Sequence, residues 1–509
     1  MRRSLRILSG LIIWWCCLAG NASGKGISSI RISSQEDFER LDTLIKSYLA
    51  ESPDSIDITI APGNYFFHEG HISLSNIQAE NTSIAIHGQD VRIYPDMHEG
   101  GSFSPDLSFY LPAADGTGPS LIFRSDTIRQ ARSLVRIVDR KQKICRVKIH
   151  GQISEEDVRD GYIYITEWFR GRIYRITGVK DDFVYFLADD LKQKRFLYNV
   201  NLDWTFSLQR PRYKLIHCGE ARQEDGALCA GATNFLSVQS SVLGGLNCSG
   251  LSFYGNNYNP ADPWDGLISF TLSEVRASFR DCMFSGMKSD CISIRKSDDI
   301  LIQGCSFSGN YRHCLRSNIS SRRTRFVGND VHGSGLSGDN VCVVTCKGED
   351  FLVKDNTISD YGYGAICIGL HYTEDKDGLV SGLVEGNEIF QSEEYFRSAP
   401  QNLLMDSGAI YIGTQNDDVR IENNYIHDIG GPTYNRGIFA DDGASHIQIR
   451  RNRVENVSNY YCIDIDPRSA WKMRFRKNRK VSVFHHDITV CDNTVVGRVR
   501  IPRWIKTED

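Results

Sequence analysis

A short phrase recurs through the second half of the chain, and its spacing constrains the fold more than any other feature. Each copy has a β-prone run, one asparagine or cysteine, a variable residue and an apolar residue. The copies begin at Phe279, Leu301, Arg325, Leu352, Leu383, Arg420, Ile449 and Val490. Most of them lie about 23 to 31 residues apart, and a fixed period on this scale is typical of a solenoid.

The asparagine or cysteine of each copy is its ladder residue. The ladder residues are Cys282, Cys305, Asn329, Asn356, Asn387, Asn424, Asn452 and Asn493. When amide side chains stack at one position per coil, they can bond to each other and to the backbone of the turn. We therefore interpret these asparagines as structural and assign none of them to catalysis.

A second run of alternating residues recurs between the phrases. It begins at Cys291, Cys314, Val341, Ala365, Ala409, Gly437 and Cys462. An alternation of period two indicates a strand with one face toward the lumen and one face outside. If Ile366, Ile410, Ile438 and Ile463 point inward, the outward column holds Cys367, Tyr411, Phe439 and Asp464, and one step further lie Gly369, Gly413, Asp441 and Asp466.

Two strands per coil with short connections cannot close as hairpins, so parallel stacking is expected. We predict an all-β fold, a right-handed parallel β-helix, with its main stack at 216–500 and a C-terminal tail at 501–509. Residues 25–123 are expected to supply the first coils and a capping helix at 38–49, since solenoids need caps. Residues 124–215 alternate like antiparallel strands, which predicts an inserted small β-rich, sandwich-like domain.

The N-terminus has the pattern of a secretory signal. Arg2, Arg3 and Arg6 precede an apolar stretch at 7–19, and small and polar residues follow. That stretch is too short for a comfortable membrane span. We therefore expect a signal peptide at 1–24 and a secreted or periplasmic protein without a membrane span; a lipid-anchored surface form through Cys16 or Cys17 is the alternative.

Composition argues against a nucleic-acid partner. The net charge is −4, and no long block of one sign is present. Thirteen cysteines remain outside the signal, without a CxxC pair or a zinc spacing, and we expect most of them to be small core residues, with occasional disulfides left open. The expected partner is a polysaccharide or oligosaccharide, bound by a monomer.

Two irregular segments, at 371–407 and 414–418, interrupt the stack. Long connections on a rigid scaffold are where function usually lies. The sequence MDSGAIYIG begins at Met405, YIHDIGG at Tyr425 and NRGIFADDGAS at Asn435. This trio resembles a pattern of right-handed β-helix glycosidases and is most similar to glycoside hydrolase family 141 and its relatives, which act as fucosidases or xylan-cleaving enzymes.

The resemblance implies that Asp406 and one of Asp441 or Asp442 are the catalytic carboxylates; Phe439 departs from the tyrosine usual in the family. Cleavage of a glycosidic bond needs one acid and one base or nucleophile, and adjacent coils about 4.8 Å apart bring carboxylates near the required separation. Two close carboxylates also push one pKa upward, which supplies the protonated partner. The alternative is that Asp441, Asp442 and the following glycine form an ordinary turn.

Six further residues are candidates for binding substrate. His427 could orient a carboxylate or bind a sugar hydroxyl, or be a satisfied surface histidine. Tyr411 and Phe439 could form a sugar-stacking platform or cover the edge of the lumen. Asp464, Asp466 and Arg468 could bind substrate and set the pKa of a partner, or form a surface ion pair of little energetic consequence.

A polysaccharide lyase acting on a uronate polymer is an alternative function. Arg295 and Arg316 could pair with a uronate carboxylate, and Asp417 with Asp418, or Asp464 with Asp466, could supply oxygens to Ca²⁺. No obvious lysine or arginine base accompanies them. Hydrolysis itself requires no cofactor, and a third alternative is a β-helix that binds carbohydrate without catalysis.

Overall fold

The computed structural model describes residues 26–508 except 96, 99–108, 113–118, 124, 133–134, 140, 143, 149–153, 157–161, 168–169, 188–211, 219–228, 231, 257–265, 288, 311, 319, 336–340, 370–379, 394–406, 414–415, 431–434, 442, 459, 468–470, 475–479 and 484. The predicted signal peptide at 1–24 lies outside the described residues.

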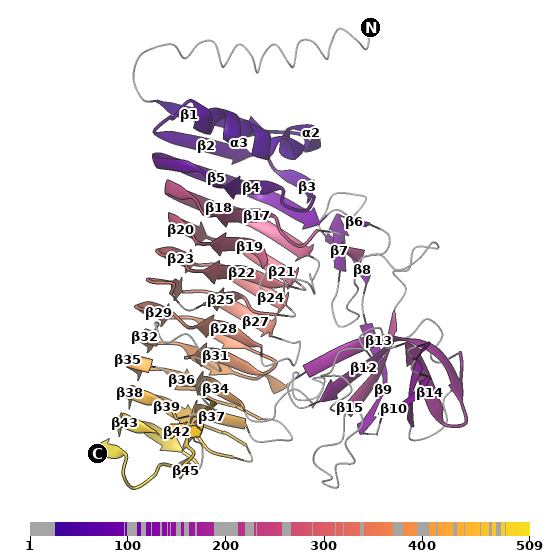
Figure 1. The fold of residues 1–509 in the computed structure, drawn as a ribbon, viewed down its shortest axis with the longest axis vertical. Helices are drawn as coiled ribbons and strands as arrows, with labels where there is room; N and C mark the ends of the chain where they lie inside the picture. The colour runs from indigo at the N-terminus through magenta and orange to yellow at the C-terminus, as the bar shows by residue number, and fades with distance from the viewer. Residues whose placement is uncertain are drawn as a thin grey trace.

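The described residues form a tall stack of parallel coils (Figure 1). Parallel strands form three columns that run the length of the stack, two of them joined in a 22-stranded sheet and one forming an 11-stranded sheet. The first column contains β1 (Ile27–Ile32), β2 (Ser55–Ile60), β5 (Gln78–Pro95), β18 (Val242–Asn256), β20 (Glu274–Arg280), β23 (Ile300–Gln303), β26 (Arg325–Val327), β29 (Phe351–Lys354), β32 (Val380–Glu385), β35 (Asn416–Glu422), β38 (Ser445–Arg450), β43 (His486–Cys491) and β46 (Lys506–Glu508).

The second column shares β5 and β18 with the first. Its other strands are β3 (Gly63–Phe67), β21 (Met283–Met287), β24 (Ser306–Asn310), β27 (Asp330–Ser334), β30 (Thr357–Ser359), β33 (Glu388–Phe390), β36 (Tyr425–Ile426), β39 (Arg453–Glu455) and β44 (Thr494–Val496). The third column contains β4 (Ile72–Ser75), β17 (Leu236–Gln239), β19 (Gly266–Thr271), β22 (Asp290–Arg295), β25 (Leu315–Ser317), β28 (Cys342–Cys346), β31 (Gly364–Ile368), β34 (Ser407–Ile412), β37 (Asn435–Ala440), β40 (Ile463–Ile465) and β45 (Val499–Arg500).

The expectation of two strands per coil is therefore wrong, because each repeated phrase contains a bend and contributes two strands. The residue before each ladder residue has a left-handed backbone, with φ between 50° and 66°. These residues are Asp281, Gly304, Gly328, Asp355, Gly386, Asn423, Arg451 and Asp492. Glycine, aspartate and asparagine tolerate this conformation best, which explains why they recur there.

The asparagine ladder is confirmed. The side-chain amide of Asn356 donates to Asn387 at 2.8 Å, and that of Asn387 donates to Asn424 at 2.9 Å. Each amide also donates to a backbone carbonyl of the preceding coil, as Asn387 does to Val353 at 2.9 Å. The ladder therefore satisfies buried backbone groups at the bend of every coil it joins.

The predicted inward face of the third column is also confirmed. Ile366, Ile410, Ile438 and Ile463 belong to the main core and are at most 1% exposed. Ten of the cysteines in the described part of the chain are buried, as expected of small core residues.

Helices cover the N-terminal end of the stack. Helices α2 (Gln35–Glu39) and α3 (Leu41–Ala50) lie beside β1, and their side chains Phe38, Leu41 and Ile45 enter the main core (Figure 1). In the described part of the chain, no helix has both the length and the apolar character needed to cross a membrane.

Residues Ser125–Cys218 carry a separate seven-stranded antiparallel sheet. Its order is β10 (Val135–Asp139), β11 (Ile144–Lys148), β14 (Phe183–Leu187), β13 (Arg170–Lys180), β12 (Tyr162–Glu167), β15 (Arg212–Cys218) and β9 (Ser125–Arg132). Three short antiparallel pairs complete the strands: β6 (Met97–His98) with β16 (Cys229–Ala230), β7 (Phe109–Pro112) with β8 (Pro119–Phe123), and β41 (Trp471–Arg474) with β42 (Lys480–Val483).

Candidate functional site

The outward side chains of the third column stand in strict register from coil to coil. The column runs through Arg316, Thr345, Cys367, Tyr411, Phe439, Asp464 and Arg500. Its central members Cys367, Tyr411 and Phe439 form a cluster separate from the main core. The predicted outward column is therefore confirmed, and it brings residues from distant parts of the sequence together on the outer side of the third column.

Tyr411 and Asp441 are in direct contact. Asp441 directly follows β37, and its backbone N–H donates to the carbonyl of Ile412 on the preceding coil at 2.9 Å. The Tyr411 hydroxyl donates to Asp441 Oδ2 at 2.8 Å. This bond holds the carboxylate of Asp441 in one orientation. Because Asp441 is only half-buried, the carboxylate still contacts solvent.

Asp441 also begins a turn, because the N–H of Ala444 donates to its carbonyl at 3.0 Å. The turn reading of this motif is thus correct for the backbone. The side chain nevertheless bonds across coils to Tyr411, which a turn does not require.

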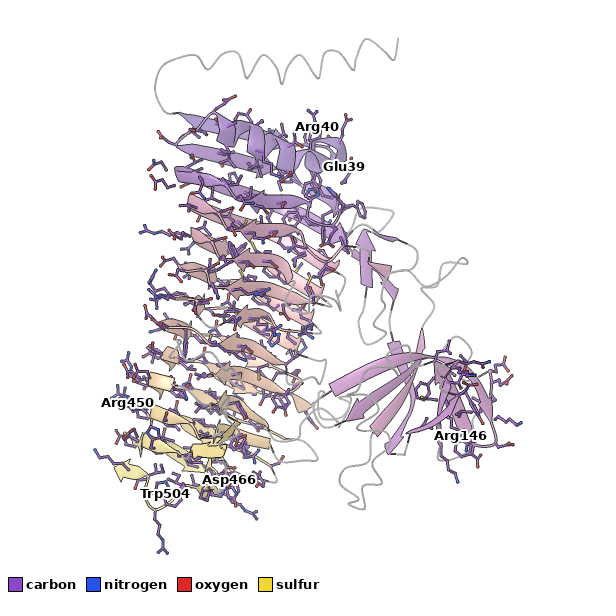
Figure 2. All side chains as sticks on the ribbon, viewed as in Figure 1. Glu39, Arg40, Arg146, Arg450, Asp466 and Trp504 are labelled. Atoms are coloured by element: carbon purple, nitrogen blue, oxygen red, sulfur yellow. The ribbon has the colours of Figure 1, made fainter. Side chains whose placement is uncertain are left out.

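A buried ion-pair network lies next along the column. Asp464 is fully buried; Arg436 Nε donates to it at 2.6 Å, and Arg500 donates at 2.6 and 2.7 Å. Arg500 also pairs with Asp466 at 2.9 Å. Asp464 therefore has no surface on which to meet a sugar and fits a role in positioning Arg436 and Arg500. Asp466 stays half-buried at the C-terminal end of the stack (Figure 2).

The expected sugar-stacking platform does not fit the structure. The guanidinium of Arg436 lies 3.7 Å from the centre of the Phe439 ring, and Tyr411 meets Phe439 edge to face at 5.3 Å. Both rings are buried, with 4% of Tyr411 and 1% of Phe439 exposed. A ring whose face is already covered cannot stack on a sugar. These rings instead pack together and fix the position of the Tyr411 hydroxyl that bonds to Asp441.

His427 is a second correction, because it lies on another face. It follows β36 in the second column and stacks between Tyr425 and Phe390. Its ring nitrogens lie 2.7 Å from Asp428 and 3.4 Å from Glu388. Glu388 lies in β33 and Asp428 follows β36, both in the 22-stranded sheet, so the carboxylates that His427 contacts are not those of the candidate site.

Three of the predicted site residues, Asp406, Asp442 and Arg468, lie outside the described residues. Sequence reasoning missed Arg436, Arg500 and His485. Arg500 is the register partner of Asp464 on the next coil, but the long connection between β40 and β45 hides this continuation of the outward column in the sequence.

His485 lies between the Asp441 turn and Asp466. Its ring nitrogens are 3.2 Å from the carbonyl oxygen of Ala444 and 3.1 Å from that of Asp466. Burial lowers the pKa of His485, although the neighbouring charges of Asp441 and Asp466 oppose that change. Its position therefore links the two predicted groups of acidic residues.

A second polar cluster lies on earlier coils of the third column. Asp290 is fully buried, and its carboxylate forms ion pairs with Arg312 at 3.1 Å and Arg316 at 3.3 Å and contacts His313 at 2.8 Å. Burial alone would raise the pKa of Asp290, but the charges of His313, Arg312 and Arg316 outweigh it and hold that pKa below its usual range. Burial lowers the pKa of Lys347, which follows β28, and the charge of Arg316 lowers it further.

The comparisons with known proteins agree with this architecture. The family described as "Right handed beta helix region" matches residues 266–479. A comparison with curated protein sequences finds no match. The right-handed parallel β-helix is therefore the class of protein that the fold defines.

Solved structures are similar to this chain at low sequence identity. A glycoside hydrolase is 12% identical, with 85% of this chain and 94% of that chain covered and a TM-score of 0.51. PfbA, a surface adhesin of Streptococcus pneumoniae, is 10% identical, with 91% and 84% covered and a TM-score of 0.38. The catalytic domain of a GH87 α-1,3-glucanase in complex with tetrasaccharides is 9% identical, with 81% and 96% covered and a TM-score of 0.28.

Proposed function

We propose that this chain is a glycoside hydrolase that acts on a plant-type or other complex polysaccharide, with Asp441 as one of its catalytic carboxylates. The observation that carries the proposal is the bond from the Tyr411 hydroxyl to Asp441 at 2.8 Å. It fixes a half-buried carboxylate on the outward face, and attack at an anomeric centre, directly or through water, needs a carboxylate in a fixed place. Asp406 or Asp442 supplies the second carboxyl group in this proposal, on the resemblance to family 141.

The surrounding residues have defined tasks in this proposal. Asp464 orients Arg436 and Arg500, and Arg436 covers the ring of Phe439 that supports Tyr411. A rigid support of this kind keeps Asp441 within the narrow range of positions that catalysis tolerates. We also propose that the protein is exported and acts as a monomer on its saccharide.

The test compares Asp441→Asn with Asp330→Asn. Asp330 is an exposed aspartate on β27 of the second column, so it is a matched control for the same chemical change. Wild type and Asp330→Asn should release reducing sugar from a panel of plant cell-wall glycans, and NMR should show the anomer formed. Asp441→Asn should release none while keeping its thermal unfolding; equal release by all three proteins would refute the assignment.

A polysaccharide lyase is the second candidate, and Lys347 is the observation that favours it. The sequence offered no obvious base, but Lys347 follows β28, and burial together with the charge of Arg316 lowers its pKa. A lysine with a lowered pKa gives up its proton more readily, and the resulting amine can remove the proton beside a uronate carboxylate while a cation neutralises that carboxylate. A lyase would yield an unsaturated product that absorbs ultraviolet light, and Lys347→Ala would abolish it.

A further inference from the structure

Two histidines and an aspartate meet at the C-terminal end of the first column, outside the third column that carries the candidate site but next in sequence to His485. His446 lies in β38, and His486 and Asp487 begin β43. Their ligand atoms all lie within 4.8 Å of one another. His486 Nδ1 is 2.7 Å from Asp487 Oδ2, His446 Nδ1 is 3.8 Å from the same oxygen, and the imidazole rings are 5.1 Å apart.

The stacking of the coils explains why these side chains converge. Ser445 pairs with His486 and Ile447 with Ile488, so His446 stands beside Asp487. Both residues have a left-handed backbone, with φ of 53° and 51°, as does Asp418 on the preceding coil, with φ of 56°. The same backbone conformation on neighbouring coils directs their side chains the same way, at a coil spacing of about 4.8 Å.

The group lines a cavity of about 590 Å³, and the cavity is polar. Asp417, Asp418, His485 and Lys506 are among its other lining residues. Trp504 also lines it; this residue is 62% exposed and lies at the C-terminal end of the stack (Figure 2). The three potential ligands are themselves exposed, so binding an ion would not require them to leave a packed core. The carboxylates of Asp417 and Asp418 add negative charge beside the group.

We propose that His446, His486 and Asp487 bind one divalent transition-metal ion, of which Zn²⁺ is the representative. Two imidazoles and one carboxylate form a ligand set that suits zinc, nickel, cobalt or copper, whereas Ca²⁺ and Mg²⁺ prefer oxygen ligands. Donor atoms already this close need only small side-chain rotations to reach about 2.0–2.2 Å from a common ion. A water or Asp418 completes the coordination.

The ion would clamp β38 to β43. These strands are neighbours in the first column, but residues 451–485 separate them in the sequence. A metal bound across them joins the two ends of that excursion. A ligand that binds only the folded chain stabilises it, and the stabilisation grows with the logarithm of the ratio of ligand concentration to Kd.

The experiment titrates Zn²⁺ alone into the full chain, prepared without a histidine tag. Calorimetry measures the heat of binding, and thermal unfolding measures the change in Tm. We expect one equivalent to bind and raise the Tm, with Ca²⁺ and Mg²⁺ giving no comparable rise. His446→Ala and His486→Ala should each weaken the affinity at least tenfold. Co²⁺ in place of Zn²⁺ should give visible absorption that both variants lose.

His87→Ala is the matched control, because His87 is also partly exposed, belongs to the first column and pairs with an aspartate, Asp57, at 3.3 Å. It should bind Zn²⁺ like wild type. Asp487→Asn, which changes no ring, gives a second test if either histidine variant unfolds. Absence of saturable binding, or wild-type affinity in His446→Ala and His486→Ala, would overturn the site.

Discussion

Removal of one ladder amide from the middle of the stack should be among the most destabilising changes outside the apolar core. In the described structure, Asn387 Oδ1 accepts from the backbone N–H of Asn356 at 3.1 Å and from its side chain at 2.8 Å. Its Nδ2 donates to Val353 at 2.9 Å, Glu385 at 3.1 Å and Asn424 at 2.9 Å. Asn387→Ala removes all five bonds.

The magnitude follows from what remains after the change. A net hydrogen bond contributes about 0.5–1.5 kcal/mol, and a buried donor left without an acceptor costs about 1–3 kcal/mol. The N–H of Asn356 is such a donor, so Asn387→Ala should lower the free energy of unfolding by about 3–5 kcal/mol. Asn493 ends the described ladder and is half-buried, so water can replace its partners; Asn493→Ala should cost about 1–2 kcal/mol.

Equilibrium unfolding in urea, followed by circular dichroism, measures both variants against wild type. The slope of each transition must match that of wild type for the midpoints to be compared as stabilities. If Asn387→Ala and Asn493→Ala lost the same stability, or if Asn387→Ala lost less than about 1 kcal/mol, the ladder would not hold the coils together as argued.

Three further variants test other parts of the structure. Burial lowers the pKa of His71 from 6.5 to about 4, so between these pH values the unfolded chain binds a proton that the folded chain does not, and stability falls as the pH falls. His71→Phe should remove about 3 kcal/mol of this loss, measured by urea unfolding at pH 7 and pH 4. Tyr411→Phe removes the bond to Asp441 and should lower kcat by about ten- to a hundredfold with an unchanged Tm; an unchanged kcat would contradict the role given to that bond. Asp464→Asn leaves Arg436 and Arg500 without a compensating charge and should cost about 3–5 kcal/mol of stability by denaturant unfolding, whereas a near-neutral change would show that the network is dispensable.

The sequence was sufficient for the stack because each coil repeats the same few requirements. The spacing of ladder residues such as Asn356 and Asn387 predicts stacked coils, and the alternation around Ile410 predicts which side of the strand is buried. The third strand of each coil was missed because the left-handed residue at its bend is variously Asp, Gly, Asn or Arg, so no single letter marks it.

The site was harder to predict because it depends on which of three faces a residue occupies. Tyr411 and Asp441 share a face through strand alternation, and alternation is visible in sequence. His427 follows a strand of another column, although it lies close to both of them in sequence. Arg500 meets Asp464 only because the coils stay in register across the intervening excursion, which sequence spacing does not reveal.

The most direct test of the catalytic proposal separates binding from turnover once the panel has identified a cleaved saccharide. Calorimetry should give Asp441→Asn nearly the same Kd for that saccharide as wild type, because the substitution keeps the shape of the side chain, while turnover falls by at least about a thousandfold. Wild-type turnover by Asp441→Asn would contradict the account.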